Sequence, residues 1–268
     1  MLTKEEVSTI FLDAETSSPE ELRHELAQMI DQTLLNPQLG FDAYKKWIEA
    51  SKDQGFASLC VSPLVVPLAL ECLADSETKV CSVINFPLGF EDADSLSMQA
   101  INLLEDGVDE IDMVMPYGAL KAKEYDFVKE HVERVYTSAL NAWDYLYAHD
   151  EFDDEDEEEH EHDHQGLVFK VILECSELSD EEICIASDLI SSIGVDFIKT
   201  STGFSSHGAD LHDVVLMSQT KEPGCQIKAS GGIRDLESVV KFINAGATRI
   251  GCSKGLEILA EFDELFAR

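Results

Sequence analysis

The stretch VDFIKTSTGF, residues 195–204, begins like a buried β-strand and ends in a charged, polar turn. Most of its first four residues are β-branched or aromatic, which is typical of strands. Lys199 follows at once, and small polar residues fill 200–203. An ammonium group at the end of a buried strand loses hydration, at a cost in free energy. The stretch therefore predicts a covered strand that ends in a lysine with a specific chemical role.

Seven further segments resemble this strand, and helical segments separate them. The eight predicted strands are 29–35, 57–62, 80–84, 110–115, 168–174, 196–200, 226–230 and 248–253. The predicted helices are 43–54, 63–73, 93–105, 125–147, 180–193, 210–220, 235–244 and 255–266. Most of the strands are continuous apolar runs, as in parallel strands that are covered on both faces. Eight β–α units predict an α/β fold, a single (β/α)8 TIM barrel that spans 1–268.

An extra helix is predicted ahead of the repeated units. Ser18 is a suitable N-cap, Pro19 favours the first helical turn, and Glu21 stands three residues after the cap. The alternative fold is an open, doubly wound sheet, which usually carries a G-x-G-x-x-G turn after its first strand. Here the sequence LLNPQLG occupies that place and lacks the motif, so the closed barrel is favoured.

An acidic insert, HDEFDDEDEEEHEHDHQG at 149–166, interrupts the path from the fourth helix to the fifth strand. From His149 to His164 it holds eleven acidic residues, four histidines and no Lys or Arg. Like-charge repulsion and the scarcity of apolar residues predict a disordered insert on the face opposite the catalytic mouth. A weak divalent-metal site is the alternative, because His160, His162 and His164 alternate with carboxylates.

The whole chain is strongly acidic, with 54 Asp and Glu against 19 Lys and Arg and a formal net charge of −35. Such a surface repels nucleic acid and anionic membranes, so we expect neither as a partner. No apolar run approaches the ~18 residues that cross a bilayer, and the N-terminus has no signal-peptide pattern. Seven cysteines without a CxxC pair indicate reduced thiols. The expected location is the cytoplasm.

Charged residues near the carboxyl ends of strands predict the reactive centre, because barrel enzymes carry their chemistry there. Lys199 ends the sixth strand and Lys228 lies near the end of the seventh, so two ammonium groups meet if both point inward. Desolvation and a like charge each lower the pKa of a lysine side chain, which makes the amine a nucleophile toward carbonyl carbons. Asp112, on the fourth strand, belongs to the same alternate set as Lys199 and is placed to transfer protons.

Each of these residues also has a plainer interpretation. A lysine at a strand end can extend to solvent, and Asp112 can simply hold a loop. The matched positions of Lys199 and Lys228, one β–α unit apart, favour the chemical role.

Small residues follow three consecutive strands and predict a phosphate site. They are Ser201-Thr202-Gly203, then Ser230-Gly231-Gly232, then Gly251 and Ser253. Backbone N–H groups and helix N-termini at these loops of a barrel bind anions. Tight turns alone are the alternative, and their repetition on three strands favours the phosphate.

Six motifs together resemble those of the deoxyribose-phosphate aldolases, a family of class I, Schiff-base aldolases. They are IDQTLLNP, VINFPLG, VDEIDMVMPYGAL, DFIKTSTGF, IKASGGIRDLES and INAGATRIGCS, and the match runs from about Asp31 to Ser253. The resemblance implies that Lys199 forms the Schiff base, that Lys228 tunes it and that Asp112 is the acid of the proton relay. The positions that it implies for substrate or phosphate binding are Asp31, Thr33, Cys60, Thr202, Gly203, Gly231, Gly232, Gly251 and Ser253.

Three positions depart from the family pattern. Some relatives have a lysine where Phe204 stands and a second serine where Lys254 stands. We therefore expect Lys254 to bind the phosphate and to matter more here than in relatives. Gln32 stands where the family usually has a histidine or another residue, and the sequence does not explain this difference.

The reaction that the resemblance implies is the reversible cleavage of 2-deoxy-D-ribose 5-phosphate to acetaldehyde and D-glyceraldehyde 3-phosphate. The iminium on Lys199 is the electron sink, so no metal or other cofactor is implied. The implied partners are small sugar phosphates and aldehydes, and relatives are often homodimers or homotetramers. The alternatives are a Schiff-base aldolase with a different aldol donor, a non-catalytic sugar-phosphate-binding barrel, and a metal-buffering protein that uses the His-rich insert.

Overall fold

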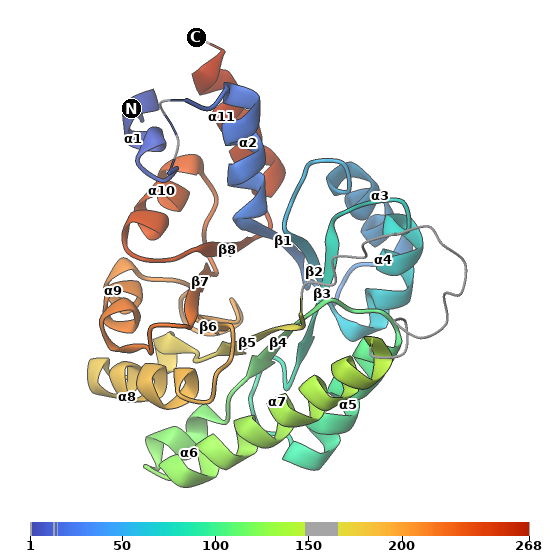
Figure 1. Cartoon of the computed structure of the whole chain (residues 1–268), viewed down its shortest axis with the longest axis vertical. Coiled ribbons are helices and arrows are strands. Elements are labelled where there is room, and N and C mark those ends of the chain that lie inside the picture. The colour runs from blue at the N-terminus through green and yellow to red at the C-terminus, as the bar shows by residue number, and fades with distance from the viewer. Residues whose placement is uncertain (1, 13, 15, 148–165, 268) are drawn as a thin grey trace, which may run out of the picture.

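The computed structural model describes residues 2–12, 14, 16–147 and 166–267. Within these residues, eight parallel strands close into one barrel, in which each strand pairs with the next along the chain and β8 pairs with β1 (Figure 1). The strands are β1 (Ile30–Leu34), β2 (Ser58–Val61), β3 (Lys79–Ile84), β4 (Glu110–Val114), β5 (Val168–Ile172), β6 (Phe197–Lys199), β7 (Gln226–Ser230) and β8 (Arg249–Cys252). The prediction of a closed (β/α)8 barrel is confirmed, and the open sheet is excluded.

Helices surround the barrel and connect its strands (Figure 1). They are α3 (Phe41–Ser51), α4 (Val66–Leu73), α5 (Ala93–Glu105), α7 (Tyr125–Tyr147), α8 (Asp180–Ser191), α9 (Leu211–Thr220), α10 (Leu236–Asn244) and α11 (Gly255–Phe266). The region predicted as one helix at 63–73 begins instead as a 3-10 turn, Pro63–Val65. A second proline, Pro67, lies in the first turn of α4, where its missing N–H is tolerated.

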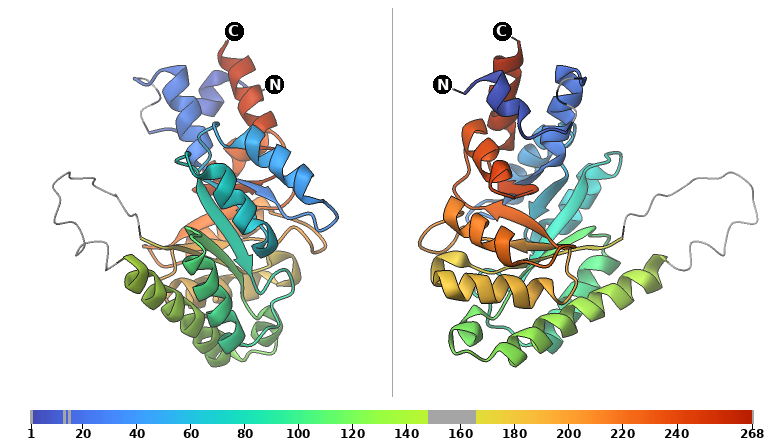
Figure 2. Two further views of the ribbon diagram at one scale, coloured as in Figure 1. Left: turned by 90° about the vertical axis from the view of Figure 1, so that its right-hand side faces the viewer. Right: turned by 60° about the vertical axis from the view of Figure 1, so that its left-hand side comes forward.

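The predicted N-terminal helix is present as α2 (Pro19–Gln28), with Ser18 and Glu21 forming the expected capping box. Two short helices were not predicted: α1 (Lys4–Ser8) and α6 (Tyr117–Lys121), each only five residues long. The two terminal regions lie together at one side of the barrel (Figure 2), where Arg23 of α2 pairs with Asp263 of α11 at 3.0 Å. The acidic insert at 149–166 lies outside the described residues except for Gly166, so its predicted disorder and metal site stay predictions.

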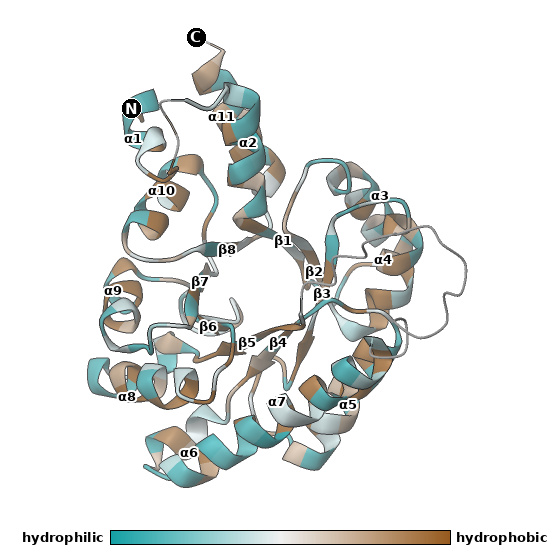
Figure 3. Ribbon diagram, in the orientation of Figure 1, coloured by the Kyte–Doolittle hydropathy of each residue, from teal (hydrophilic) through white to brown (hydrophobic). Residues whose placement is uncertain are grey.

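Two regions of buried residues differ in character. Outward-facing strand residues such as Leu59, Ile111 and Ile198 pack under the helices in one continuous apolar core, and Figure 3 shows hydrophobic stretches in β4 and β5 as well as in the surrounding helices. The inside of the barrel holds charged side chains instead, among them the fully buried Asp112 and Lys170. Most barrels fill this space with branched apolar residues. Among the described residues, no helix combines the length and the apolar character that spanning a membrane requires.

Gln32, the residue that the sequence left unexplained, fastens α11 to the barrel. Its side chain is buried, and its Oε1 accepts a hydrogen bond of 2.9 Å from the N–H of Gly255, at the start of α11. The N-cap residue, Lys254, makes no such bond with its own side chain. A Cβ on Gly255 would come within 2.8 Å of both Gln32 Oε1 and the Phe56 ring, so this close approach requires glycine. Gln32 thus caps α11 from a neighbouring strand.

We expect Gln32→Leu to lower the free energy of unfolding by about 1–3 kcal/mol, because it leaves the buried Gly255 N–H without an acceptor. Urea unfolding at neutral pH measures this difference. Gln38→Leu is the control: Gln38 is exposed, so its replacement should change stability by less than about 0.5 kcal/mol. Equal stability of the two variants would show that Gln32 does not cap α11.

Candidate active site

A pocket of about 440 Å³ opens at the carboxyl ends of β1, β6, β7 and β8. Of the residues predicted from the sequence to bind or react with substrate, it is lined by Thr33, Lys199, Thr202, Gly203, Gly231, Gly232, Gly251 and Ser253. Asp31, Cys60, Asp112, Lys228 and Lys254 are not among the lining residues. The first four of these are buried inside the barrel, whereas Lys254 lies on the surface.

Lys199 and Lys228 lie side by side, as their strand positions predicted. They are register partners on β6 and β7, and both donate to the same atom, Asp112 Oδ2, at 2.6 and 2.7 Å. Lys199 is only 3% exposed, yet it borders the pocket, whereas Lys228 and Asp112 are fully buried. Lys199 is therefore the amine of this pair that a ligand in the pocket can meet.

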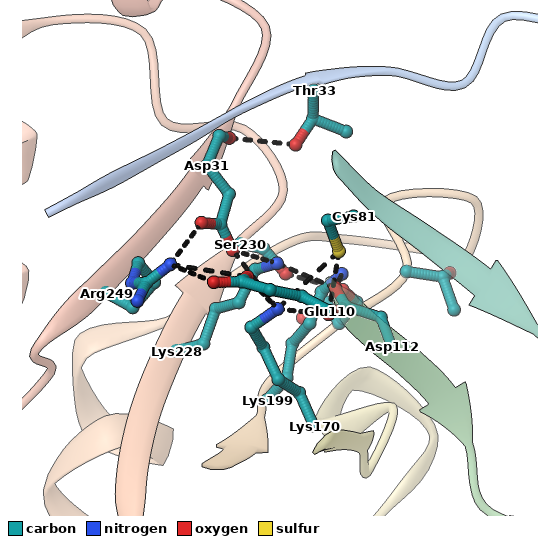
Figure 4. A network of polar contacts seen from close by, with 12 residues as sticks. Asp31, Thr33, Cys81, Glu110, Asp112, Lys170, Lys199, Lys228, Ser230 and Arg249 are labelled. Atoms are coloured by element: carbon teal, nitrogen blue, oxygen red, sulfur yellow. Dashed lines mark hydrogen bonds and ion pairs between the residues drawn. The ribbon is translucent and has the colours of Figure 1, made fainter. Parts of the chain in front are cut away.

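A larger ion-pair network extends behind these three residues (Figure 4). Asp31 pairs with Lys228 at 2.5 Å and with Arg249 at 2.6 Å. Glu110 pairs with Arg249 at 3.3 Å and with Lys170 at 2.5 Å. Asp31, which the family resemblance implied to be near the substrate, thus serves as a counterion inside the barrel.

The sequence did not identify three members of this network, which are Lys170, Glu110 and Arg249. Lys170 and Arg249 are each the single charge of a short strand, and Glu110 shares β4 with Asp112. A charged residue in such a strand signals burial of charge if its side chain points inward. Lys170 Nζ donates to Asp112 Oδ1 at 3.0 Å, so both carboxylate oxygens of Asp112 bind lysine. Figure 4 shows the lysine side chains converging on this carboxylate.

Attraction between opposite charges favours the charged forms of two carboxyls and three cations of the network. Burial favours the neutral form of Asp31 and Asp112, but the cations around them outweigh it and hold the pKa of both carboxyls well below the usual range. Burial likewise opposes charge on Lys170, Lys228 and Arg249, yet the carboxylates raise the pKa of all three groups. The prediction that neighbouring ammonium groups lower each other's pKa allowed for Asp112 but not for Asp31 or Glu110, and for Lys228 the direction is the opposite.

Two cysteines complete the interior. Cys60 and Cys81 are fully buried register partners on β2 and β3, and Cys81 Sγ lies 3.4 Å from Asp112 Oδ1. A hydrogen bond with Cys81 lowers the pKa of the Cys60 thiol, and burial raises that of Cys81. With Asp112 they form a group whose ligand atoms lie within 4.8 Å of one another. The ammonium groups that already bind Asp112 oppose a metal cation there.

The turns at the mouth of the pocket have the backbone conformation that glycine favours. Gly203, Gly231 and Gly232 have φ values of 83°, 90° and 80°. A Cβ on Gly231 would approach the Gly208 Cα to 2.8 Å, so the loops after β6 and β7 meet at a distance that only glycine permits. These open turns border the pocket at the positions where the sequence predicted a phosphate.

Arg234 lines the mouth of the pocket, and Lys254 is not among the lining residues. Arg234 lines the pocket and stands two residues after Gly232 in the motif IKASGGIRDLES, so its position was visible in the sequence. Lys254 pairs instead with Glu257, on the first turn of α11. Phe204 lines an apolar wall and contacts the Phe86 ring edge-on, with 5.4 Å between centroids.

Comparisons with known proteins agree with this geometry. The model of the DeoC/LacD family aldolases matches residues 26–261. A deoxyribose-phosphate aldolase of Caldanaerobacter subterraneus subsp. tengcongensis is 39% identical over 243 residues, which is 91% of this chain and 96% of the relative. One of Enterococcus faecalis is 39% identical over 236 residues, or 88% and 96%.

Solved structures show the same likeness. The structure described as QR15, an aldolase, has a TM-score of 0.76 and 34% identity over 89% of this chain and 96% of its own. A tetrameric deoxyribose phosphate aldolase from Aeropyrum pernix has a TM-score of 0.75 and 28% identity over 98% of this chain and 100% of its own.

We expect Asp31→Asn to lower the free energy of unfolding at pH 7 by about 3–5 kcal/mol, because it leaves buried cations without their counterion. The folded-state pKa of Asp31 lies below the unfolded value of ~3.9, so its stabilisation is present above that pH and is lost as the pH falls. Urea unfolding between pH 3 and 7 should therefore show a flatter acid limb for the variant than for the parent.

The control for this prediction is Asp263→Asn, which removes the exposed ion pair with Arg23. Surface pairs contribute less than about 1 kcal/mol. A loss of stability in Asp31→Asn no larger than in Asp263→Asn would contradict a stabilising role of the buried network.

Proposed function

The chain belongs to the DeoC/LacD family of aldolases, and from this premise we propose that it cleaves 2-deoxy-D-ribose 5-phosphate reversibly to acetaldehyde and D-glyceraldehyde 3-phosphate. The observation that carries the proposal is the placement of Lys199 at the base of a glycine-lined pocket, joined through one carboxylate oxygen to Lys228. A nucleophilic amine below an anion-binding mouth suits an aldehyde that carries a phosphate at its other end.

Lys199 begins the reaction by attacking C1 of the ring-opened sugar. The carbinolamine loses water to give an iminium, which draws electrons from the C2–C3 bond as the 3-hydroxyl gives up its proton. Cleavage releases glyceraldehyde 3-phosphate and leaves an enamine on Lys199. Protonation of the enamine at C2 and hydrolysis of the new iminium release acetaldehyde and the free amine. The water lost in the first stage is regained in the last.

Asp112 links Lys199 and Lys228, the two amines that exchange a proton during these reaction steps. Its Oδ2 lies within 2.7 Å of both Lys199 and Lys228 Nζ, so a proton passes between them over one acceptor atom. Because the pKa of Asp112 is held low, the carboxylate is a transient carrier and does not store the proton. Lys228 is fully buried and acts through Asp112.

The phosphate binds at the turns after β6, β7 and β8 in this proposal. Gly203, Gly231 and Gly232 line the pocket without side chains, and Arg234, which also lines it, brings a positive charge. An arginine matches a phosphate through two parallel N–H donors. Holding the phosphate fixes the sugar relative to Lys199, which lowers the entropic part of the barrier.

The functional unit is a homodimer or homotetramer in this proposal, as the sequence resemblance implied. Support comes from the Aeropyrum pernix relative, whose structure is described as tetrameric. Light scattering after gel filtration measures the mass of the assembly, and a mass of 29.7 kDa, that of one chain, would count against it.

We expect Lys199→Ala to abolish cleavage of deoxyribose 5-phosphate while the variant stays folded, because Lys199 is the one lysine among the described residues that lines this pocket and can form the imine there. Borohydride reduction in the presence of acetaldehyde should add one ethyl group to the parent, at Lys199, and none to the variant. Intact-mass and peptide mass spectrometry measure the adduct. The exposed Lys46 provides the control Lys46→Ala, which should keep activity and adduct. Retained turnover in Lys199→Ala would refute the mechanism.

We expect Arg234→Gln to raise KM for deoxyribose 5-phosphate about tenfold, the size of one charge-assisted hydrogen bond, and to leave KM for unphosphorylated deoxyribose unchanged. Steady-state kinetics with both substrates test this.

Lys254→Gln is the matched control, and it should change neither KM by more than about twofold, because its ammonium pairs with Glu257 outside the pocket. This replaces the prediction from sequence that Lys254 binds the phosphate. A larger effect at Lys254 than at Arg234 would restore that prediction.

A further inference from the structure

The turn after β6 contributes three residues to the lining of the pocket, which are Thr202, Gly203 and Phe204. A hydrogen bond within the turn closes it around Gly203: the N–H of Phe204 donates to Thr202 Oγ1 at 3.1 Å. Gly203 itself has the positive φ of 83° that this tight turn requires. The shape of the turn therefore depends on where the Thr202 hydroxyl is held.

Glu174, on the neighbouring segment after β5, holds that hydroxyl. Its Oε2 accepts a hydrogen bond from Thr202 Oγ1 at 2.5 Å, and its Oε1 accepts one from Thr202 N at 3.2 Å. Glu174 is only 2% exposed and is not among the residues that line the pocket. A chain of hydrogen bonds thus runs from a buried carboxylate, through Thr202, to the backbone of Phe204.

The backbone of Glu174 adopts a left-handed conformation, with φ 59° and ψ 58°, which is uncommon for a residue other than glycine. It lies between two backbone hydrogen bonds of 2.8 Å to β6 and the turn: Leu173 N donates to Lys199 O, and Cys175 N donates to Thr200 O. Glycine would adopt this conformation at a lower cost. A non-glycine residue in such a conformation indicates a role for its side chain, and the two bonds to Thr202 supply one.

The loop after β6 has a second attachment to the same segment. Ser205 Oγ donates to Glu177 Oε1, and Glu177 ends the 3-10 turn Cys175–Glu177 that follows Glu174. If the side chain of Glu174 is removed, this second contact still joins the loop to its neighbour. Replacement of Glu174 should therefore act mainly on the turn at 202–204.

We propose that Glu174 is a positioning residue for phosphate binding, which fixes the turn after β6 by holding Thr202 through both its N–H and its hydroxyl. The proposal rests on the function inferred above, since it presumes that this turn binds the phosphate of the substrate. Because Glu174 does not border the pocket, it acts on the substrate through Thr202 alone.

The charge of Glu174 must be separated from its hydrogen bonds. Burial raises the pKa of its carboxyl and the bonds from Thr202 lower it, while Glu177 raises it and Lys199 lowers it. Glu174 also adds to the effect of burial in raising the pKa of Tyr117, on α6. A replacement that removes the charge can therefore also affect the Lys199 amine, so the experiment needs a variant that changes charge without shape.

Two replacements of Glu174 make this separation. Glu174→Gly removes the carboxylate and suits the left-handed backbone, whereas Glu174→Gln removes the charge but keeps an acceptor for Thr202 N and a donor for Thr202 Oγ1. We expect Glu174→Gly to lower kcat/KM for deoxyribose 5-phosphate about tenfold or more, because a small displacement of a binding group can cost up to ~10²-fold. For unphosphorylated deoxyribose, kcat/KM should stay within about twofold, and Glu174→Gln should stay within about twofold for both substrates.

Variants of Thr202 test whether Glu174 acts through it. Thr202→Val removes the hydroxyl at nearly constant size and should show the same selective loss, whereas Thr202→Ser keeps the hydroxyl and should resemble the parent. The double variant Glu174→Gly/Thr202→Val should lose no more than the more affected single variant, because both changes break one chain of contacts. Glu181→Gln, at an exposed glutamate in the first turn of α8, is the control and should change neither substrate's kcat/KM.

Steady-state kinetics of the purified variants at pH 7 measure these effects. A loss confined to the phosphorylated substrate, absent in Glu174→Gln and not multiplied in the double variant, supports the proposal. Equal losses for both substrates, a loss in Glu174→Gln as large as in Glu174→Gly, or multiplied losses in the double variant overturn it. If Glu174→Gly does not fold, Glu174→Asn replaces it, because asparagine tolerates the left-handed backbone and its side chain is one methylene shorter.

The same measurements distinguish a failure of this role from a failure of the proposed function. Parent enzyme that does not cleave deoxyribose 5-phosphate would overturn the proposed function and the role of Glu174 with it. Parent enzyme that cleaves it, beside a Glu174→Gly variant with unchanged kcat/KM, would overturn the role of Glu174 alone.

Discussion

The interior of this barrel depends on the ion pairs between the Asp112 carboxylate and three buried lysines. One of its oxygens binds Lys199 and Lys228, and the other binds Lys170. Without the lysines, a fully buried carboxylate would pay a large desolvation penalty, and without the carboxylate the ammonium groups would repel one another. Each side of the arrangement requires the other. Strands β4 to β7 must therefore keep the register that places these side chains at one depth.

Because the interior of the barrel is polar, its stability depends mainly on the apolar packing between the outer face of the sheet and the helices. A network of buried ion pairs is weak evidence for net stability, because desolvation offsets most of the attraction. The apolar core between the strands and the helices contributes the larger favourable term, since hydrophobic burial scales with area. The inside of the barrel can therefore hold buried ion pairs, which set the protonation states of Asp31, Asp112 and Lys228. Gln32, which connects β1 to α11, is one of the contacts that joins the two regions.

An anionic substrate meets a chain with a net charge of −35, so binding depends on local groups. Surface charges farther away than about one Debye length, ~8 Å at physiological salt, are screened. The local groups at the mouth of the pocket are Arg234 and the glycine turns. Backbone N–H dipoles at such turns attract anions without adding a titratable group. In the proposed function, the phosphate site is thus separate from the lysines inside the barrel.

The sequence by itself determined the eight β–α units and the closed barrel, and it predicted that Lys199, Lys228 and Asp112 lie together, as they do in the structure. The units follow from the spacing of apolar residues along the chain. The meeting of the three side chains follows from the rule that parallel strands end at the same edge of the sheet. Both can be inferred from the order of residues alone. Only the tertiary structure decided that Lys170, Glu110 and Arg249 complete the network, and that Arg234 and not Lys254 lines the pocket. A lone charge in a strand does not name its partner, because partners are set by register across strands far apart in the chain. A lysine in a loop likewise does not show whether it meets a ligand or a neighbouring glutamate until the helix after it is in place.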